Sequence, residues 1–125
     1  MRASSFSEYA QCILDSIEEL LSTGQAVLFD FTNDQRSTLR GFIGGVLHFE
    51  DSSELHFREF VDTSLPEPRL MYAYHYQDAA MNLVFRYDNA AHKPALPQAE
   101  HKHTREEIHL TLAPTFEQVV DEILG

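Results

Sequence analysis

Long hydrophobic runs, paired cysteines and basic side chains are all scarce in this chain of 125 residues. No apolar run approaches the roughly 18 residues that a membrane-spanning helix needs, so we expect no insertion into a membrane. Residues 1–20 carry acidic side chains inside their apolar stretch, which argues against a signal peptide. Cys12 is the single cysteine, so no internal disulfide is expected and a reducing, cytoplasmic location fits the composition.

The charge of the chain is strongly negative, with 9 basic and 20 acidic residues and a formal net charge of −11. Such a charge opposes non-specific binding to nucleic-acid phosphates. Six of the seven histidines and most of the basic residues lie between residues 54 and 109, so any local positive potential must arise there. The two ends of the chain are predicted to form acidic faces, which are either solvated or a surface for a basic partner.

Two helices are predicted, one at each end of the chain, because apolar residues recur there at spacings of three and four. Ser5 is expected to cap the first helix, with Glu8 as the other half of a capping box, and Gly24 to end it. Pro114 suits the first turn of the second helix. These helices are predicted to cover one face of a sheet.

About five strands are predicted between the helices, where β-branched and aromatic residues alternate with polar ones between short turns. The predicted strands form an antiparallel meander and cover residues 25–32, 37–50, 54–62, 70–77 and 82–88. The segment 89–105 is predicted to be a loop, and 106–112 either a last strand or the entry to a helix. The chain is therefore predicted to be a single α+β domain, residues 1–125.

Local turn residues refine this prediction at two places. Asn33 and Asp34 favour a turn that closes the first strand. Three glycines of the second strand, Gly41, Gly44 and Gly45, indicate a bend or bulge rather than a flat ladder.

Arg58, His75 and Arg86 are predicted to share one face of the sheet if the hairpins pair in simple register. Arginine holds a planar anion such as phosphate with two donors, and histidine exchanges a proton near neutral pH. This combination suits metal-independent cleavage of RNA, in which a base activates the 2′-hydroxyl and arginine stabilises the charged phosphorane. The alternative is that the arginines only form cross-strand ion pairs, with Glu54, Glu59 or Asp88.

A second group of polar residues comprises Asp88, His92, His101 and His103. His101 and His103 would share one face if they lay on a strand, and a zinc site there would recruit Asp88 or His92. Because the segment is predicted to be a loop and contributes no cysteine, we assign no metal and no cofactor to it. A histidine loop that faces phosphate, and exposed histidines without a role, remain the other interpretations.

Four short motifs of this region occur together and in order: ELHFREFVD, YAYHYQD, LVFRYDNAAHKP and HKH. They resemble the TumE-type toxin family of bacterial toxin–antitoxin systems, whose members carry FRE-like, YHYQ-like and RYDNAPHHP-like segments and a later histidine pair. The resemblance covers residues 45–104 and departs at residues 91–93, where this chain has one histidine fewer. It implies a growth-inhibiting toxin of a type II system, neutralised by a cognate antitoxin that has a helix-turn-helix domain.

The resemblance and the sheet pattern together select the candidate site residues. The predicted catalytic residues are Arg58, Glu59, His75, Arg86, Asp88 and His92. The predicted substrate-binding residues are Tyr74, Tyr76, Tyr87, Asn89, His101 and His103. In this interpretation the arginines clamp phosphate, a histidine or Glu59 acts as base, and the tyrosines stack on unpaired bases of an RNA.

A non-catalytic binding module is the alternative function. Its acidic helices would dock a basic protein, and an exposed sheet edge would pair with another chain, including a second copy in a homodimer.

Overall fold

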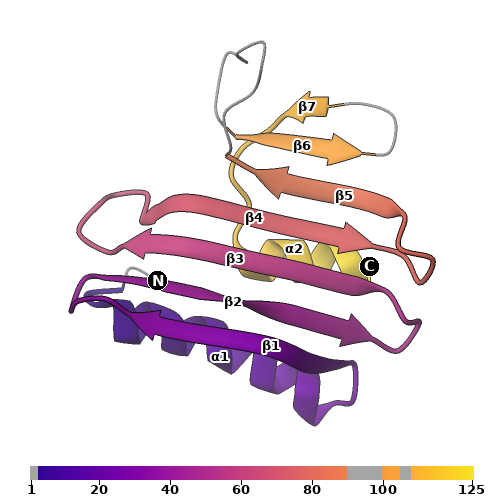
Figure 1. Ribbon diagram of the computed structural model, residues 1–125, viewed down its shortest axis with the longest axis horizontal. Helices are drawn as coiled ribbons and strands as arrows, with labels where there is room; N and C mark the ends of the chain where they lie inside the picture. Colours follow the sequence, from indigo (N-terminus) through magenta and orange to yellow (C-terminus); the bar gives the residue numbers. More distant parts are fainter. Residues whose placement is uncertain (1–2, 90–99, 105–107) are drawn as a thin grey trace.

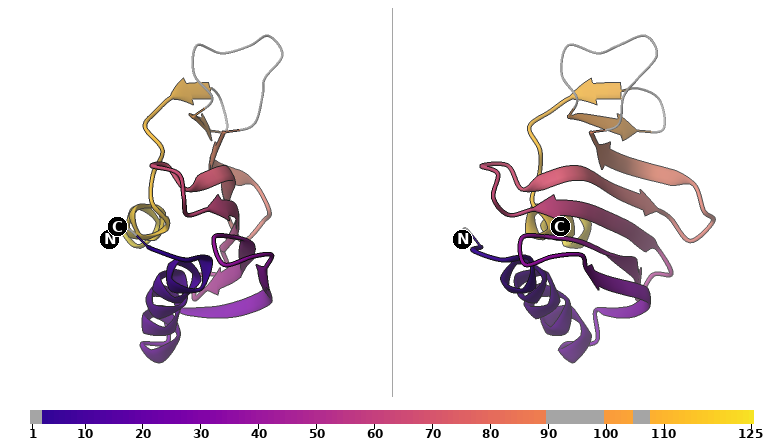
Figure 2. Two further views of the ribbon diagram at one scale, coloured as in Figure 1. Left: turned by 90° about the vertical axis from the view of Figure 1, so that its left-hand side faces the viewer. Right: turned by 60° about the vertical axis from the view of Figure 1, so that its left-hand side comes forward.

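The computed structural model describes residues 3–89, 100–104 and 108–125 of the chain. Within these residues, seven strands form one antiparallel sheet in the order β1-β2-β3-β4-β5-β6-β7, so each strand pairs with its neighbours in the sequence. Helices α1 and α2 lie on the same face of this sheet, and the opposite face is not covered by any described helix (Figure 1, Figure 2). The predicted α+β architecture, a meander with a helix at each end, is confirmed.

Helix α1 (Phe6–Ser22) begins and ends where the sequence predicts. The Ser5 hydroxyl accepts a hydrogen bond from the backbone N–H of Glu8 at 3.1 Å. The Glu8 carboxylate accepts one from the Ser4 hydroxyl at 2.7 Å, which replaces the second half of the predicted capping box. Gly24, with a φ of 74°, takes the left-handed conformation that ends such a helix. The buried stripe of α1 faces the sheet and consists of Phe6, Ala10, Ile13, Ile17 and Leu20.

The strands differ from the prediction mainly in their number. They are β1 (Ala26–Gln35), β2 (Arg40–Phe49), β3 (Glu54–Asp62), β4 (Arg69–Gln77), β5 (Leu83–Asp88), β6 (His101–Thr104) and β7 (Ile108–Leu110). β6 lies inside the segment that was predicted to be a loop. It is a strand because four of its residues pair in register with β5, and such pairing supplies hydrogen bonds that local propensity does not signal.

The first hairpin turns later than the sequence predicts. Asn33 and Asp34 lie inside β1, paired with β2. The chain turns beyond them, where the backbone N–H groups of Arg36 and Ser37 donate to the carbonyl of Arg40 at 2.9 and 3.0 Å. Continued pairing with β2 therefore outweighs the turn preference of the Asn-Asp pair.

A β-bulge interrupts β1, opposite the glycines of β2. The register shifts between Phe29 and Thr32, and Asp30 inside the bulge has a φ of 51°. Gly44 faces this region, and a Cβ atom there would lie 2.9 Å from the backbone oxygen of Phe57. The glycine thus permits a close approach of neighbouring strands. Because it has no side chain, nothing projects from the sheet at this position.

Helix α2 (Phe116–Leu124) closes the core from the C-terminal side. Thr115 is its N-cap in a complete capping box, so Pro114 precedes the helix and does not lie in its first turn. The Phe116 ring packs 5.0 Å from the ring of Phe57 on β3. The core between the helices and the sheet includes Ile43, Leu47, Leu55, Val61, Tyr72, Tyr74, Phe85 and Val119. Neither described helix is long and apolar enough to cross a bilayer.

Candidate functional site

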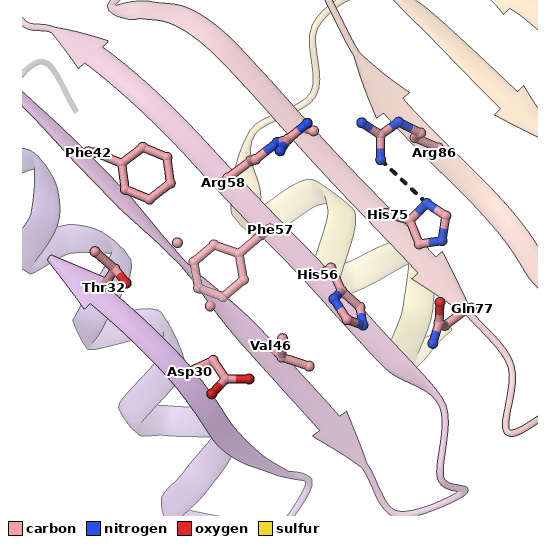
Figure 3. A pocket seen from close by; sticks show the side chains of 13 residues that line it. Asp30, Thr32, Phe42, Val46, His56, Phe57, Arg58, His75, Gln77 and Arg86 are labelled. Carbon is pink, nitrogen blue, oxygen red and sulfur yellow. Dashed lines mark hydrogen bonds between the residues drawn. The ribbon is translucent and has the colours of Figure 1, made fainter. Parts of the chain in front are cut away.

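A pocket of about 510 Å³ opens on the helix-free face of the sheet. This volume lies in the range of small-molecule sites. Gly44, Gly45 and Ala73 are among the residues that line it. Polar side chains from β1, β3, β4 and β5 also line it (Figure 3). Those polar side chains are Asp30, Thr32, His56, Arg58, His75, Gln77 and Arg86. The small residues leave space, and the arginines and histidines make the pocket suited to an anionic ligand.

The register of the sheet brings three predicted residues, Arg58, His75 and Arg86, into this pocket. His56, His75 and Arg86 are direct cross-strand partners on β3, β4 and β5. Arg58 lies two residues from His56 and pairs with Ala73, whose methyl group leaves space beside the guanidinium. The simple register that the sequence analysis assumed is therefore present, and Arg58, His75 and Arg86 share one face.

The two arginines of the pocket differ in their partners. The Nε atom of Arg86 donates to Oδ2 of Asp88 at 2.7 Å, and its Nη1 lies 3.4 Å from Nδ1 of His75. Arg58 is exposed and makes no ion pair or hydrogen bond through its side chain within the described part of the chain. The ion-pair interpretation thus holds for Arg86, whereas Arg58 is available to a ligand.

His75 is the residue of the pocket best suited to accept a proton. Its pKa is lowered, first because burial disfavours the charged ring and then because the positive charge of Arg86 lies nearby. A lowered pKa keeps the imidazole neutral at neutral pH, as a general base requires. The His56 ring stands perpendicular to the His75 ring at 6.2 Å between centroids, so two imidazoles flank the same space.

Two predicted residues, Glu59 and Tyr74, lie on the opposite face of the sheet and are fully buried under the helices. The Glu59 carboxylate accepts hydrogen bonds from the hydroxyls of Tyr9 and, at 2.7 Å, of Tyr74. Arg69 donates to the same Tyr74 oxygen at 2.9 Å. Burial raises the pKa of Glu59. These side chains form a polar cluster inside the core, and the structure separates them from the pocket.

Three further predicted residues also make contacts away from the pocket. The hydroxyl of Tyr76 donates to Ser53 at 2.8 Å, and that of Tyr87 donates to Glu122 of α2 at 2.6 Å. The amide oxygen of Asn89 accepts from a backbone N–H of β4 at 3.0 Å. These contacts tie the sheet to its turns and to α2, so base stacking on these tyrosines has no support from their positions.

The remaining candidates lie beside the pocket or outside the described residues. Asp88, His101 and His103 form a cluster at the β5–β6 pair, beyond Arg86. Asp88 links this cluster to the pocket through its bond to Arg86. His92 lies outside the residues that the structure describes.

Among the pocket residues that sequence reasoning missed are His56, Phe42 and Asp30. His56 lies on the same predicted face as Arg58. Pairing the LHFR segment with the YHYQ segment, strand against strand, would have placed His56 beside His75. Phe42 provides an aromatic surface at the pocket (Figure 3), where the tyrosines had been expected. Asp30 lines the pocket from the β-bulge, which lies in β1 and not in the glycine-containing strand where the sequence predicts it.

In a comparison with protein families, the family model described as "Toxin TumE" matches residues 12–125 of the chain. The matched span contains all of the pocket residues. No curated protein and no solved structure matches the chain.

Proposed function

Because the chain belongs to the TumE toxin family, we propose that it inhibits growth as the toxin of a type II toxin–antitoxin system, by cleaving RNA without a metal ion. The observation that carries this proposal is the convergence of Arg58, His75 and Arg86 on one pocket of the helix-free face. The partner that we propose is a cognate antitoxin with a helix-turn-helix domain, as the family resemblance implies.

The proposed reaction is an in-line attack of the ribose 2′-oxygen on the adjacent phosphorus. Neutral His75 removes the proton of the 2′-hydroxyl, and the bond from phosphorus to the 5′-oxygen breaks, which leaves a 2′,3′-cyclic phosphate. His56, 6.2 Å from His75 between ring centroids, is placed to return a proton to the departing 5′-oxygen. Arg58 holds the non-bridging oxygens, where negative charge grows in the transition state.

The overall charge of −11 restricts how RNA reaches this pocket. Most of the surface repels phosphate, while the pocket gathers two arginines and two histidines on one face. The partly exposed ring of Phe42 provides a stacking surface for one unpaired base. We therefore propose that the substrate is a short single-stranded segment that enters from the helix-free side.

The pH dependence of cleavage tests the role of His75. The pKa of this ring is lowered. The cleavage rate is therefore expected to stay high at the ordinary histidine pKa of about 6.5 and to fall only at a more acidic pH. The His75→Ala variant is expected to lose about 10²–10⁴-fold in rate, together with this acidic limb. The measurement is cleavage of a labelled RNA between pH 5 and 8.

The matched control is His48→Ala, because His48 lies on the same sheet but pairs with Glu54 outside the pocket. It is expected to keep both the rate and the profile. An unchanged acidic limb in His75→Ala would rule out His75 as the base. A pure and folded protein that cleaves no RNA at any pH would favour the binding-module interpretation.

A further inference from the structure

A cluster of three potential metal ligands lies on the same face, next to the pocket. Asp88 on β5 and His101 on β6 are direct cross-strand partners. His103 follows two residues later on β6, so both imidazoles point to the face that carries Asp88. No metal is predicted here from the sequence, because residues 89–105 lack a strand pattern. The strand β6 removes that objection, since a fixed register now holds the ligands together.

The side chains of this cluster bring three potential ligand atoms close together. Nε2 of His101 lies 2.5 Å from Oδ1 of Asp88, and Nε2 of His103 lies 3.7 Å from Oδ2. One ligand atom from each residue can be chosen so that all three lie within 4.8 Å of one another. Tetrahedral zinc with bonds of about 2.0–2.1 Å separates its ligand atoms by about 3.3 Å. Binding of the ion therefore requires the direct contact between His101 and Asp88 to open.

Burial and the neighbouring arginine also fit a bound cation. The side chains of His101 and Asp88 are 0% and 5% exposed, whereas His103 remains 22% exposed. Two of the three ligands are therefore buried, and His103 is the one that solvent reaches. Arg86 donates to Oδ2 of Asp88 at 2.7 Å, an outer contact of the kind that orients a carboxylate ligand.

We propose that Asp88, His101 and His103 bind one zinc ion, a site that is separate from the Arg58–His75 pocket. Two imidazole nitrogens and one carboxylate oxygen form a donor set that zinc accepts, with water in the fourth position. The ion fixes the four-residue strand β6 on β5 and holds the carboxylate that orients Arg86. It takes no part in the cleavage proposed above, so this site does not depend on that function.

Zinc binding by untagged protein tests this proposal, because a histidine tag would itself bind the ion. After stripping with a chelator, the wild-type chain is expected to bind one Zn²⁺ in isothermal titration and to melt at a higher temperature when Zn²⁺ is added. Since even outer-shell changes cost about 10–100-fold in metal affinity, His103→Ala and Asp88→Asn are expected to weaken binding by more than about 100-fold.

The His48→Ala variant is the control, since it removes one histidine from the same sheet without touching the cluster. It is expected to bind Zn²⁺ as the wild type does. His103 is the preferred target because it is partly exposed, and circular dichroism establishes that its variant remains folded. Absence of Zn²⁺ binding in the wild type would overturn the site, and so would equal binding in folded His103→Ala. Either result would leave an Asp88–histidine hydrogen-bond cluster.

Discussion

Replacing Arg58 with alanine is expected to abolish growth arrest and to leave the fold intact. Arg58 is the one pocket arginine without an ion-pair partner in the described part of the chain, so its loss leaves no buried charge behind. In the proposed reaction it contacts the phosphate in the transition state. Removing one such donor costs about 10²–10³ in rate, which is about 2.7–4 kcal/mol of barrier.

Growth curves after induction of the chain alone, with RNA cleavage by the purified protein beside them, measure this effect. Arg36→Ala is the matched control, because Arg36 pairs with Asp34 and does not line the pocket. It is expected to arrest growth as the wild type does. Growth arrest by Arg58→Ala at the wild-type level of protein would show that the pocket does not carry toxicity.

Replacing Glu59 with alanine is expected to destabilise the protein severely, for a reason unrelated to catalysis. The change would leave the hydroxyls of Tyr9 and Tyr74 without their acceptor inside the core. Unsatisfied buried donors cost about 1–3 kcal/mol each, so the free energy of unfolding is expected to fall by about 2–6 kcal/mol. That is a large part of the 5–15 kcal/mol that is typical of folded domains. Urea unfolding followed by circular dichroism measures it.

Glu59→Gln separates a structural role from a catalytic one. The glutamine oxygen still accepts one hydrogen bond, so a smaller loss of stability is expected, and growth arrest is expected to persist. The pKa of Glu59 is raised by burial, so the folded state retains its proton to a higher pH than the unfolded state. Stability of the wild type should therefore fall as pH rises through that interval, and the glutamine variant should not show this fall. Loss of arrest with unchanged stability would instead support Glu59 as a catalytic base.

Strands β2 to β5 and the shared face of Arg58, His75 and Arg86 were predictable from the sequence. Short turns at residues 51–53 and 78–82 leave little freedom in register, and alternation then decides which face each residue occupies. The helix positions followed from their apolar stripes and from the caps at Ser5 and Gly24. Local patterns were sufficient here because each contact joins elements that are adjacent in the sequence.

The burial of Glu59 and Tyr74 was missed for a different reason. Alternation already placed Glu59 between Phe57 and Val61, on the apolar face, but the motifs of the resemblance drew it into the site. The buried carboxylate of Glu59 needs hydrogen-bond donors, and one of them is the hydroxyl of Tyr9, which is far away in the sequence. No local pattern reveals such a partner.

The strand β6 depends on tertiary structure in the same way. His101, Lys102 and His103 carry little strand propensity, and only pairing with β5 makes them a strand. This pairing is also what gathers Asp88 with the two histidines. The sequence alone therefore does not show that the three potential zinc ligands lie together.

The most direct measurement compares an RNA oligonucleotide with the same oligonucleotide carrying a single 2′-deoxyribose on the 5′ side of the cleavage position. The reaction that we propose for the Arg58–His75 pocket requires the 2′-hydroxyl. The account therefore predicts that the ordinary RNA yields a 2′,3′-cyclic phosphate and that the substituted RNA stays intact at that position. Equal cleavage of both oligonucleotides there, or a product without the cyclic phosphate, would contradict it.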